Sequence, residues 1–334
     1  MKRINIFAVL TMSASALFAQ TQYDAARITG TELNGTARFV GMGGAMGALG
    51  ADISVIGTNP AGIALFRSHN VSTSFGFNKN MTSSTFNGTK VNDSRTKASF
   101  DQIGFVYSNK IGNKTNLRYL NFGFNYHKAA NFNRQFTSKG ALNGSSLSWQ
   151  MTDMMIGAGY GSQESYDNVL DADNPYTSEY FYGTPFLGAM GARTGLVDGG
   201  TDEQGFYMMG WNGDMGEYYS REEGGINQYD FNMSFNVQDR YYFGVTLGVY
   251  DVNYKRYSSY SETLLDDNGA DNGNFTLNNW FSTQGTGYDL KFGFIARPFE
   301  YSPFRIGFAV HTPVWYMLTD RYTCLLYTSD AADE

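Results

Sequence analysis

Three histidines, His69, His127 and His311, are the side chains of this chain best suited to proton transfer near neutral pH. His127 and His311 each follow an alternating polar face, so both are expected to point to the same side of a sheet as their polar neighbours. A hydrolase would pair such a histidine with a serine and an acid. Neither histidine has these partners in a recognisable triad motif, so we expect hydrogen-bonded polar residues, no catalytic residue and no enzyme. A hydrolase that depends on His127 or His311 is an alternative.

A glycine-rich segment is the next candidate, because such loops can cradle the phosphates of a nucleotide. Gly41, Gly43, Gly44 and Gly47 lie close together, but Met46 occupies the position of the last glycine in G-x-G-x-x-G. No strand–helix–strand unit surrounds the segment. We therefore expect no cofactor.

Clustered acidic residues could bind a metal ion. The loop 266–274 carries three aspartates and three asparagines, whose oxygens would suit Ca²⁺. Their order does not fit the register of an EF-hand loop. We interpret this loop, and likewise Asp198, Asp202 and Glu203, as solvated surface, and we expect no metal site.

A period-two pattern dominates the chain from about residue 70 to residue 317. Its clearest copies are 120–126, 229–235 and 243–249, in which Phe, Tyr, Leu and Val alternate with Gly, Asn, Ser, Thr and Asp. Such a period is a β-strand whose two faces meet different environments. Strands of about 9–11 residues with aromatic residues on one face are typical of transmembrane barrels, apolar toward lipid and polar toward the lumen. The predicted fold is all-β, a transmembrane antiparallel β-barrel.

The spacing of the pattern predicts both strands and connections. The strands are expected near 70–79, 99–109, 117–130, 226–237, 240–254, 287–298 and 303–317. The short connections are 109–116, 238–240 and 299–302, and the long ones are 80–98, 131–225 and 255–286. Short periplasmic turns and long outer loops are the rule for such barrels, so the N-terminus is expected on the periplasmic side.

Charged residues on the inward faces need partners, because the barrel interior is partly desolvated. We expect them to pair with one another or with the N-terminal segment, and an ion-selective filter is the alternative. These residues are Asp230, Asp289, Lys291, Arg297 and Arg305.

Composition and the N-terminus agree with an exported barrel. Residues 1–19 read as a cleaved signal peptide, with Lys2 and Arg3 before an apolar run that ends near Ala19. Mean hydropathy is −0.35, which excludes a helical membrane protein, and the single cysteine excludes a disulfide scaffold. The net charge of −7 argues against binding to nucleic acid. The expected location is the outer membrane of a Gram-negative bacterium.

The last eleven residues, 324–334, break the pattern and resemble the translation of a sequencing adapter. On this interpretation the chain is a fragment, and 69–323 is a partial barrel with about half its strands. A genuine polar tail is the alternative.

The long loop 131–225 contains two apolar patches, which would be costly in water unless they pack or bind something apolar. One interpretation is a site that captures hydrophobic ligands, and the other is a cap that packs on itself. The ligand-contacting residues would be Trp149, Met151, Met154, Met155, Phe181, Phe186 and Leu187.

The segment Ala-Arg-Phe-Val-Gly-Met-Gly-Gly-Ala at 37–45, followed by Asn-Pro-Ala-Gly at 59–62, closely resembles the N-terminal hatch of FadL/TodX-type outer-membrane transporters. The resemblance implies a fourteen-stranded barrel plugged by a hatch, here residues 20–68. It further implies passive uptake of hydrophobic small molecules such as long-chain fatty acids. Asn59, Pro60 and Ala61 carry over as hatch residues, within the same segment as Gly41, Gly43 and Gly44.

The resemblance also implies the partners: hydrophobic small molecules, outer-membrane lipid and lipopolysaccharide, with a monomeric full-length protein. Movement of the hatch would open the route. One alternative is a surface receptor or adhesin whose long loop binds a macromolecule. Another is a general porin, which the hatch-like segment disfavours.

Overall fold

The structure is a computed structural model that describes residues 22–171, 185–266 and 268–329. The predicted signal peptide, Phe181 and residues 330–334 lie outside the described residues.

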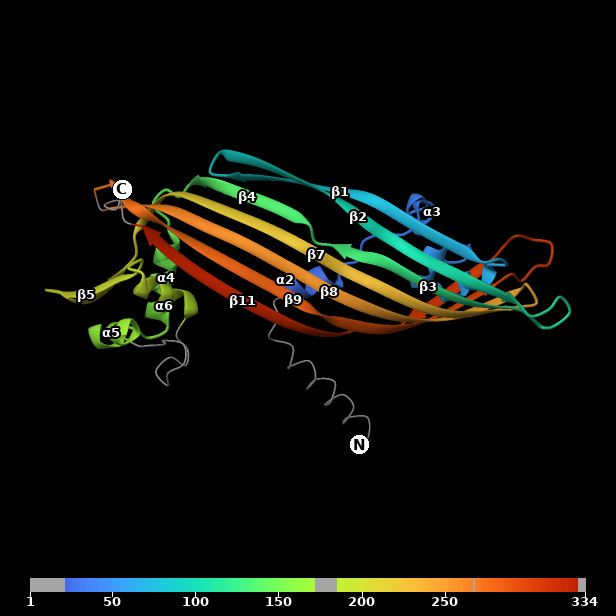
Figure 1. The fold of residues 1–334 in the computed structure, drawn as a ribbon. Helices are drawn as coiled ribbons and strands as arrows, with labels where there is room; N and C mark the ends of the chain where they lie inside the picture. The colour runs from blue at the N-terminus through green and yellow to red at the C-terminus, as the bar shows by residue number, and fades with distance from the viewer. Residues whose placement is uncertain (1–21, 172–184, 267, 330–334) are drawn as a thin grey trace, which may run out of the picture.

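One antiparallel sheet forms most of the described molecule and curls into a half-barrel (Figure 1). Its central order is β1-β2-β3-β7-β8-β9; β4 pairs with β7, and β10 and β11 both pair with β9. The strands are β1 (Asn70–Phe86), β2 (Thr89–Lys110), β3 (Leu117–Asn131), β4 (Arg134–Ala141), β7 (Asn212–Val237), β8 (Tyr241–Leu265), β9 (Asp271–Ala296), β10 (Ile306–His311) and β11 (Trp315–Ser329). The predicted all-β antiparallel barrel class is confirmed.

The alternation seen in the sequence becomes two different faces of this sheet. Phe231 and Phe243 are about half exposed on the convex face, whereas Ser234 and Thr246 are fully buried on the concave face. Aromatic rings of adjacent strands contact one another on the convex face, as Phe124 and Phe231 do with centroids 5.2 Å apart. Cross-strand pairs of this kind stabilise register.

Two of the three long connections were predicted wrongly, because they are mostly strand. Residues 80–98 belong to β1 and β2, which meet at the two-residue turn Asn87–Gly88. Both turn residues have positive φ, 42° and 85°, as a tight hairpin turn requires. Residues 255–286 belong to β8 and β9, joined by the short loop 266–270. These outer halves were missed because Ser, Thr, Asn and charged residues occupy both of their faces.

The segment 131–225 is not a simple loop either. It contains β4 and the start of β7, which belong to the sheet, and three helices and a small hairpin, which form a cap at one end of the sheet (Figure 1). The helices and hairpin strands are α4 (Leu147–Gly157), α5 (Gln163–Asp171), α6 (Phe186–Arg193), β5 (Asp198–Asp202) and β6 (Gly205–Met209). Turns 111–116 and 238–240 lie at the opposite end.

The C-terminal part also differs from the expected boundaries. The predicted strand 303–317 is divided at residues 312–314 into β10 and β11, which pair with successive parts of β9. Pro313 lies in the division, where it has no N–H to donate to the ladder. Residues 324–329 continue β11, and Cys324 lies opposite Asn279.

The N-terminal segment lies on the concave face as four short helical elements, and we call residues 22–68 the hatch. These elements are α2 (Gln22–Thr29), α3 (Ala37–Gly41), η2 (Ile53–Gly57) and η3 (Pro60–Leu65). Polar side chains begin three of them: Thr36, Asp52 and Asn59 each accept a hydrogen bond from a backbone N–H of the following turn. Among the described residues, no helix is both long enough and apolar enough to cross a bilayer.

Candidate functional site

The Asn59-Pro60-Ala61 turn rests directly on the sheet. The Asn59 amide donates to the carbonyl oxygen of Gly47 at 2.6 Å, and its Oδ1 accepts from the Ala61 N–H at 3.1 Å. Opposite the turn, the sheet has Gly244 and Gly293. A Cβ at Gly244 would lie 2.3 Å from the carbonyl carbon of Pro60, and one at Gly293 would lie 2.1 Å from Asn59 Oδ1. These two glycines therefore let the hatch backbone touch the wall, which the sequence alone did not reveal.

The predicted hatch glycines do not form a phosphate cradle. Gly43 and Gly44 have φ of +63° and +74° and turn the chain just after α3. Gly41 ends α3 and has open space around its Cα. The turn leads to Met46, which is fully buried among hatch residues. Their role in this structure is to fold the hatch compactly.

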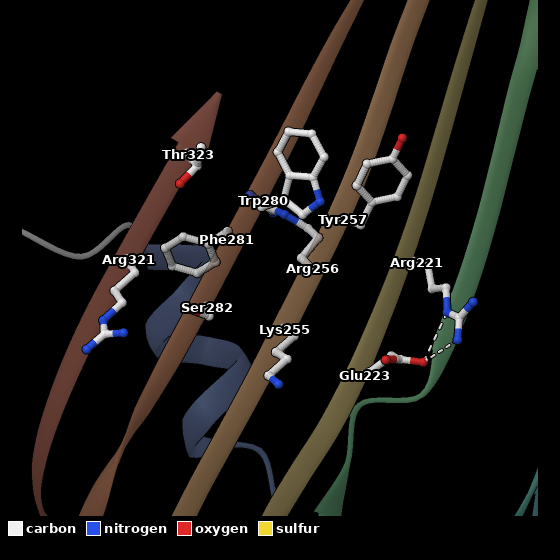
Figure 2. Close-up of a pocket in the computed structure, with 10 residues that line it drawn as sticks. All are labelled: Arg221, Glu223, Lys255, Arg256, Tyr257, Trp280, Phe281, Ser282, Arg321 and Thr323. Atoms are coloured by element: carbon white, nitrogen blue, oxygen red, sulfur yellow. Dashed lines mark hydrogen bonds and ion pairs between the residues drawn. The ribbon is translucent and has the colours of Figure 1, made fainter. Parts of the chain in front are cut away.

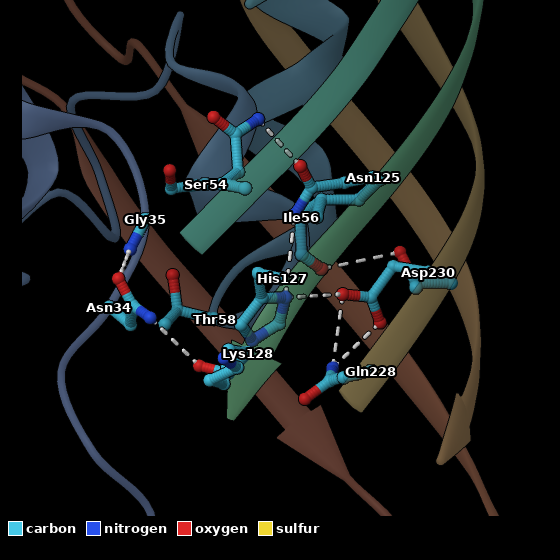
Figure 3. Close-up of polar contacts among 12 residues, drawn as sticks. Asn34, Gly35, Ser54, Ile56, Thr58, Asn125, His127, Lys128, Gln228 and Asp230 are labelled. Atoms are coloured by element: carbon cyan, nitrogen blue, oxygen red, sulfur yellow. Dashed lines mark hydrogen bonds and ion pairs between the residues drawn. The ribbon is translucent and has the colours of Figure 1, made fainter. Parts of the chain in front are cut away.

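A buried group of charges lies on the wall beneath the hatch, and Figure 3 shows one of its members, Asp230, with Gln228 and His127. Lys291 Nζ is 2.9 Å from Asp230 Oδ1 and 3.2 Å from Asp289 Oδ1, and all three side chains are almost fully buried. The Gln228 amide donates to Asp230, and the Tyr250 hydroxyl donates to Asp289 at 2.9 Å. The predicted pairing is confirmed for these three of the five inward charges.

Both strand histidines reach this region from the wall. His127 Nδ1 lies 3.6 Å from Asp230 Oδ2, and His311 Nε2 lies 2.9 Å from the carbonyl oxygen of Thr58 in the hatch. Arg305 likewise donates to the hatch, to the Leu49 carbonyl oxygen at 2.7 Å. Arg297 instead bonds to the carbonyl oxygen of Glu300. The sequence correctly predicted that both histidines lie on the polar face of the sheet. It did not predict the contact between His127 and Asp230, because the two residues are about a hundred positions apart in the chain.

The wall has a break in its backbone ladder at residues 132–133. Pairing of β2 with β3 ends at Gln102 and His127, and within the described residues no ladder joins β2 to β4. The free edge of β4 is instead bonded by side chains of β1. Thr82 donates to the carbonyl oxygen of Gln135 at 2.8 Å, and Ser84 donates to that of Thr137 at 2.7 Å. The two halves of the wall are thus joined here by side chains rather than by strand pairing.

The hatch covers this break from the concave side. The Glu32 N–H donates to the Ala129 carbonyl oxygen at 2.9 Å, and the Asn34 amide donates to that of Lys128 at 3.1 Å. Arg27 of α2 lies 3.5 Å from the Glu222 carboxylate and stacks over the Tyr254 ring at 4.6 Å. The N-terminal helix is therefore held at the break by the contacts of Arg27 and by Ile28, which is buried in an apolar cluster with Ala129 and Phe132.

A strap across the break is formed by Arg95 of β2. It donates to the Glu222 carbonyl oxygen at 2.9 Å and to the Glu223 carboxylate. Glu223 also accepts from Arg221. These two guanidinium groups lower the pKa of Glu223 to about 2, and the Arg221 hydrogen bond is the largest cause.

We expect this strap to be stable to acid. Because the folded pKa of Glu223 lies below its ordinary value, its contribution to stability is full above about pH 4.5 and is lost as pH falls through about 2. Trypsin cleavage after Arg95, measured relative to an unstructured reference peptide because trypsin itself is less active at lower pH, should therefore be equally slow at pH 8 and pH 6. In Glu223→Gln it should be at least fivefold faster at both. Equal cleavage of the two proteins would show that Glu223 does not hold the strap.

A pocket of about 330 Å³ opens on the concave face beside the strap and toward the cap. Phe136 and Tyr218 form its apolar side, with ring centroids 6.2 Å apart. Arg134 and Arg256 supply positive charge: Arg134 lies 3.2 Å from Glu222, and Arg256 stacks over the ring of Phe281. Thr82, Ser220 and Glu222 itself complete the lining. We call this the luminal pocket.

Sequence reasoning missed the luminal pocket entirely. All of its residues lie in 80–98, 131–225 or 255–286, which were interpreted as loops without a defined face. The alternation of β7 and β8 continues through Ser220, Glu222 and Arg256, but polar residues on both faces hide it.

The cap divides the residues predicted to contact ligand into two groups. Met151 and Met155 are fully buried in a cluster with α5, α6 and the wall residues Leu264 and Phe275, and Leu187 packs against it. Trp149, Met154 and Phe186 are 37%, 42% and 43% exposed. The buried group fits a self-packed cap, whereas the exposed group offers apolar surface.

A buried carboxylate attaches the cap to the wall. Glu262 of β8 is 1% exposed, accepts the Leu147 N–H at 2.8 Å and bonds the Ser146 hydroxyl. Both donors lie at the start of α4, where free N–H groups favour an anion. The start of α4 is thereby fixed over the mouth of the half-barrel.

The acidic loop between β8 and β9 organises its own backbone. Asp266 accepts from the N–H groups of Asn268 and Ala270, each at 2.8 Å. These bonds, the one to Ala270 first, lower the pKa of Asp266. No group of three or more potential metal-binding side chains occurs in the part of the chain that the structure describes.

No protein-family model matches this chain, and no curated protein is significantly similar to it. One solved structure that resembles it weakly is the CymD monoaromatic hydrocarbon channel, at 10% sequence identity and a TM-score of 0.17. The alignment covers 91% of this chain and 98% of that one. A TM-score this low carries no argument about function, which must therefore be inferred from the geometry of the chain.

Proposed function

We propose that this chain forms the wall and hatch of an outer-membrane channel for passive uptake of hydrophobic small molecules. The preferred substrate class is an apolar chain that ends in a carboxylate, as in long-chain fatty acids. Diffusion down a gradient needs no covalent step, so no enzymatic role is assigned to His127 or Asp230.

The convex face supports placement in a membrane. It is a band of Phe, Leu, Val and Met side chains, and one edge of the band is a row formed by Tyr229, Val249, Tyr288 and Trp315 on adjacent strands. Aromatic rows of this kind mark the interface between lipid and water. The cap lies beyond this row, so the cap end faces outward and the short turns face the periplasm.

The route we propose runs from the cap to the break in the wall. Exposed Trp149, Met154 and Phe186 would take up the apolar molecule above the membrane. The luminal pocket would hold it next, and withdrawal of α2 from the break at 132–133 would release it. Withdrawal of α2 would break the contacts of Arg27 with Glu222 and Tyr254 and would expose Ile28, which packs against Phe132 and other apolar residues of the wall.

The observation that carries the proposal is the pairing of aromatic rings with arginines in the luminal pocket. Phe136 and Tyr218 offer surface for an alkyl chain, and guanidinium groups bind carboxylates more strongly than neutral groups do. Within the described residues, Arg256 has a ring contact but no carboxylate within ion-pair distance. It is therefore the group we assign to the ligand carboxylate.

Replacing Arg256 with glutamine tests this assignment. We expect the Kd for a fluorescent long-chain fatty acid to rise about 10- to 150-fold, because a charge-assisted hydrogen bond contributes roughly 1.5–3 kcal/mol. The Kd for the methyl ester of the same acid should change less than twofold. Titration of the protein in detergent, followed by fluorescence, gives both values.

The matched control is Lys110→Gln, which removes one exposed positive charge at the far end of the wall. It should leave both constants unchanged. Equal weakening of the acid and the ester by R256Q would mean that Arg256 shapes the pocket but does not bind the carboxylate.

A further inference from the structure

A second groove lies on the convex face of the wall, outside the proposed membrane band (Figure 2). Its volume is about 580 Å³. Two adjacent rows of outward side chains form most of it across four strands, and Arg256 and Phe281, from the positions between these rows, also line it. The first row is Glu223, Lys255, Ser282 and Arg321, and the second is Arg221, Tyr257, Trp280 and Thr323. We call this the outer groove.

The distance of the outer groove from the edge of the proposed membrane band follows from the pairing of the strands. Each residue of its first row lies six positions from the corresponding residue of the aromatic row that contains Tyr229 and Tyr288. Six residues of strand span about 20 Å, and the tilt of barrel strands reduces this to roughly 15 Å along the membrane normal. At that height the wall is surrounded by headgroups and sugars rather than by alkyl chains.

The outer groove carries excess positive charge. Arg221, Lys255 and Arg321 are all exposed, and Glu223 is the one acid in the lining. Glu223 is already bonded to Arg221 and Arg95. Within the described residues, neither Lys255 nor Arg321 has an acidic partner. The next acid on the convex face is Asp251, which lies four residues from Lys255 in the direction of the aromatic row. Its carboxylate accepts a hydrogen bond from the Asn227 amide.

Two aromatic rings lie in the row next to Lys255 and Arg321. Tyr257 and Trp280 are neighbours on adjacent strands, with centroids 5.4 Å apart, and Trp280 is 41% exposed. Figure 2 shows the two rings side by side in this second row and Lys255 in the first. An exposed ring with cations beside it can stack on the apolar face of a sugar while the cations bind a phosphate on that sugar.

We propose that the outer groove binds a phosphorylated sugar of the lipopolysaccharide that surrounds the wall. Lys255 and Arg321 contact the phosphate, and Trp280 stacks on the sugar ring. The proposal rests on the outer-membrane placement given above. It assigns the convex face a ligand distinct from the transported molecule, which occupies the concave face. Lipopolysaccharide bound here would brace β7, β8, β9 and β11 near the strap.

The test is binding of fluorescent lipopolysaccharide to the whole chain in detergent, followed by anisotropy. We expect Lys255→Gln with Arg321→Gln to raise the Kd at least tenfold. The charge-matched control, Lys110→Gln with Lys114→Gln, removes two exposed lysines at the opposite end and should change it less than twofold. Trp280→Leu should raise the Kd about threefold or more. Circular dichroism checks that each variant keeps its strand content.

Binding of several ligands to the same protein shows which kind of phosphate the outer groove recognises. Dephosphorylated lipopolysaccharide should bind at least tenfold more weakly than the intact form, and phosphatidylglycerol vesicles should not compete. An unchanged Kd in K255Q/R321Q overturns the proposal. Displacement by inorganic phosphate at the concentration of lipopolysaccharide also overturns it, because the groove would then be a simple anion site.

Fatty-acid binding measured on the same samples distinguishes this proposal from the proposed function. K255Q/R321Q should bind the fatty acid normally, since both residues lie on the convex face. If the unmodified chain binds lipopolysaccharide but does not bind the fatty acid, the proposal that the luminal pocket binds fatty acids is contradicted and the proposal for the outer groove is not.

Discussion

Replacing Lys291 with methionine is expected to lower the free energy of unfolding by about 3–5 kcal/mol, because it leaves buried carboxylates without their cation. Lys291 lies between Asp230 and Asp289 at 2.9 Å and 3.2 Å. Tyr250 and Gln228 would still donate to these acids but cannot neutralise them. Denaturant unfolding in detergent, followed by intrinsic fluorescence, measures the change.

The control for this variant is Lys110→Met at an exposed position. A surface substitution of this kind should change stability by no more than about 0.5 kcal/mol. If K291M cost no more than the control, the three charges could not be the buried network that the structure shows.

Gly244→Ala is expected to detach the hatch from the wall. The added methyl group would lie 2.3 Å from both the carbonyl carbon and the oxygen of Pro60, so the Asn59-Pro60-Ala61 turn must move. Overpacking of this kind costs about 1–3 kcal/mol, so amide exchange in residues 60–66 should accelerate roughly 5- to 150-fold. Hydrogen exchange with mass spectrometry on peptides from this segment measures the effect.

Gly41→Ala is the matched control, because a Cβ at Gly41 meets nothing within 4 Å. Its exchange in the same peptides should stay within twofold of the unmodified chain. Equal protection of residues 60–66 in G244A and the unmodified chain would mean that the hatch does not rest on the wall at this point.

The half of the sheet with clear alternation was predictable because its two faces differ in polarity. Where apolar convex positions alternate with small or polar concave positions, as in 229–235 and 243–249, residue type alone indicates the strand. The outer halves of the strands lose this contrast. One local signal was still available there: Asn87-Gly88 is the preferred sequence for a two-residue hairpin turn.

The candidate site was less predictable because its contacts join distant parts of the chain. Arg27 and Glu222 are 195 residues apart, and nothing local to either residue indicates the other. Asn59 and Pro60 could be recognised as hatch residues, but the wall glycines that receive them are ordinary small residues of an alternating strand. Only the register of β8 and β9 places Gly244 and Gly293 beneath the turn.

The central claim is that α2 of the hatch must leave the break in the wall for a hydrophobic molecule to pass. Arg27 of α2 and Glu222 of the wall are suited to test it, because the Arg27 guanidinium lies 3.5 Å from the Glu222 carboxylate. The variant carries Arg27→Cys and Glu222→Cys, with Cys324→Ser to remove the native thiol, and a short reducible reagent joins the two cysteines.

The decisive measurement is transfer of a fluorescent long-chain fatty acid into lipid vesicles that contain the cross-linked protein. We predict that cross-linking lowers the transfer rate at least tenfold and that reduction restores it. As the control, the same variant is treated with a thiol reagent that modifies each cysteine but cannot join the two, and its transfer rate is measured. Transfer that is equally fast with the hatch joined to the wall would contradict the account.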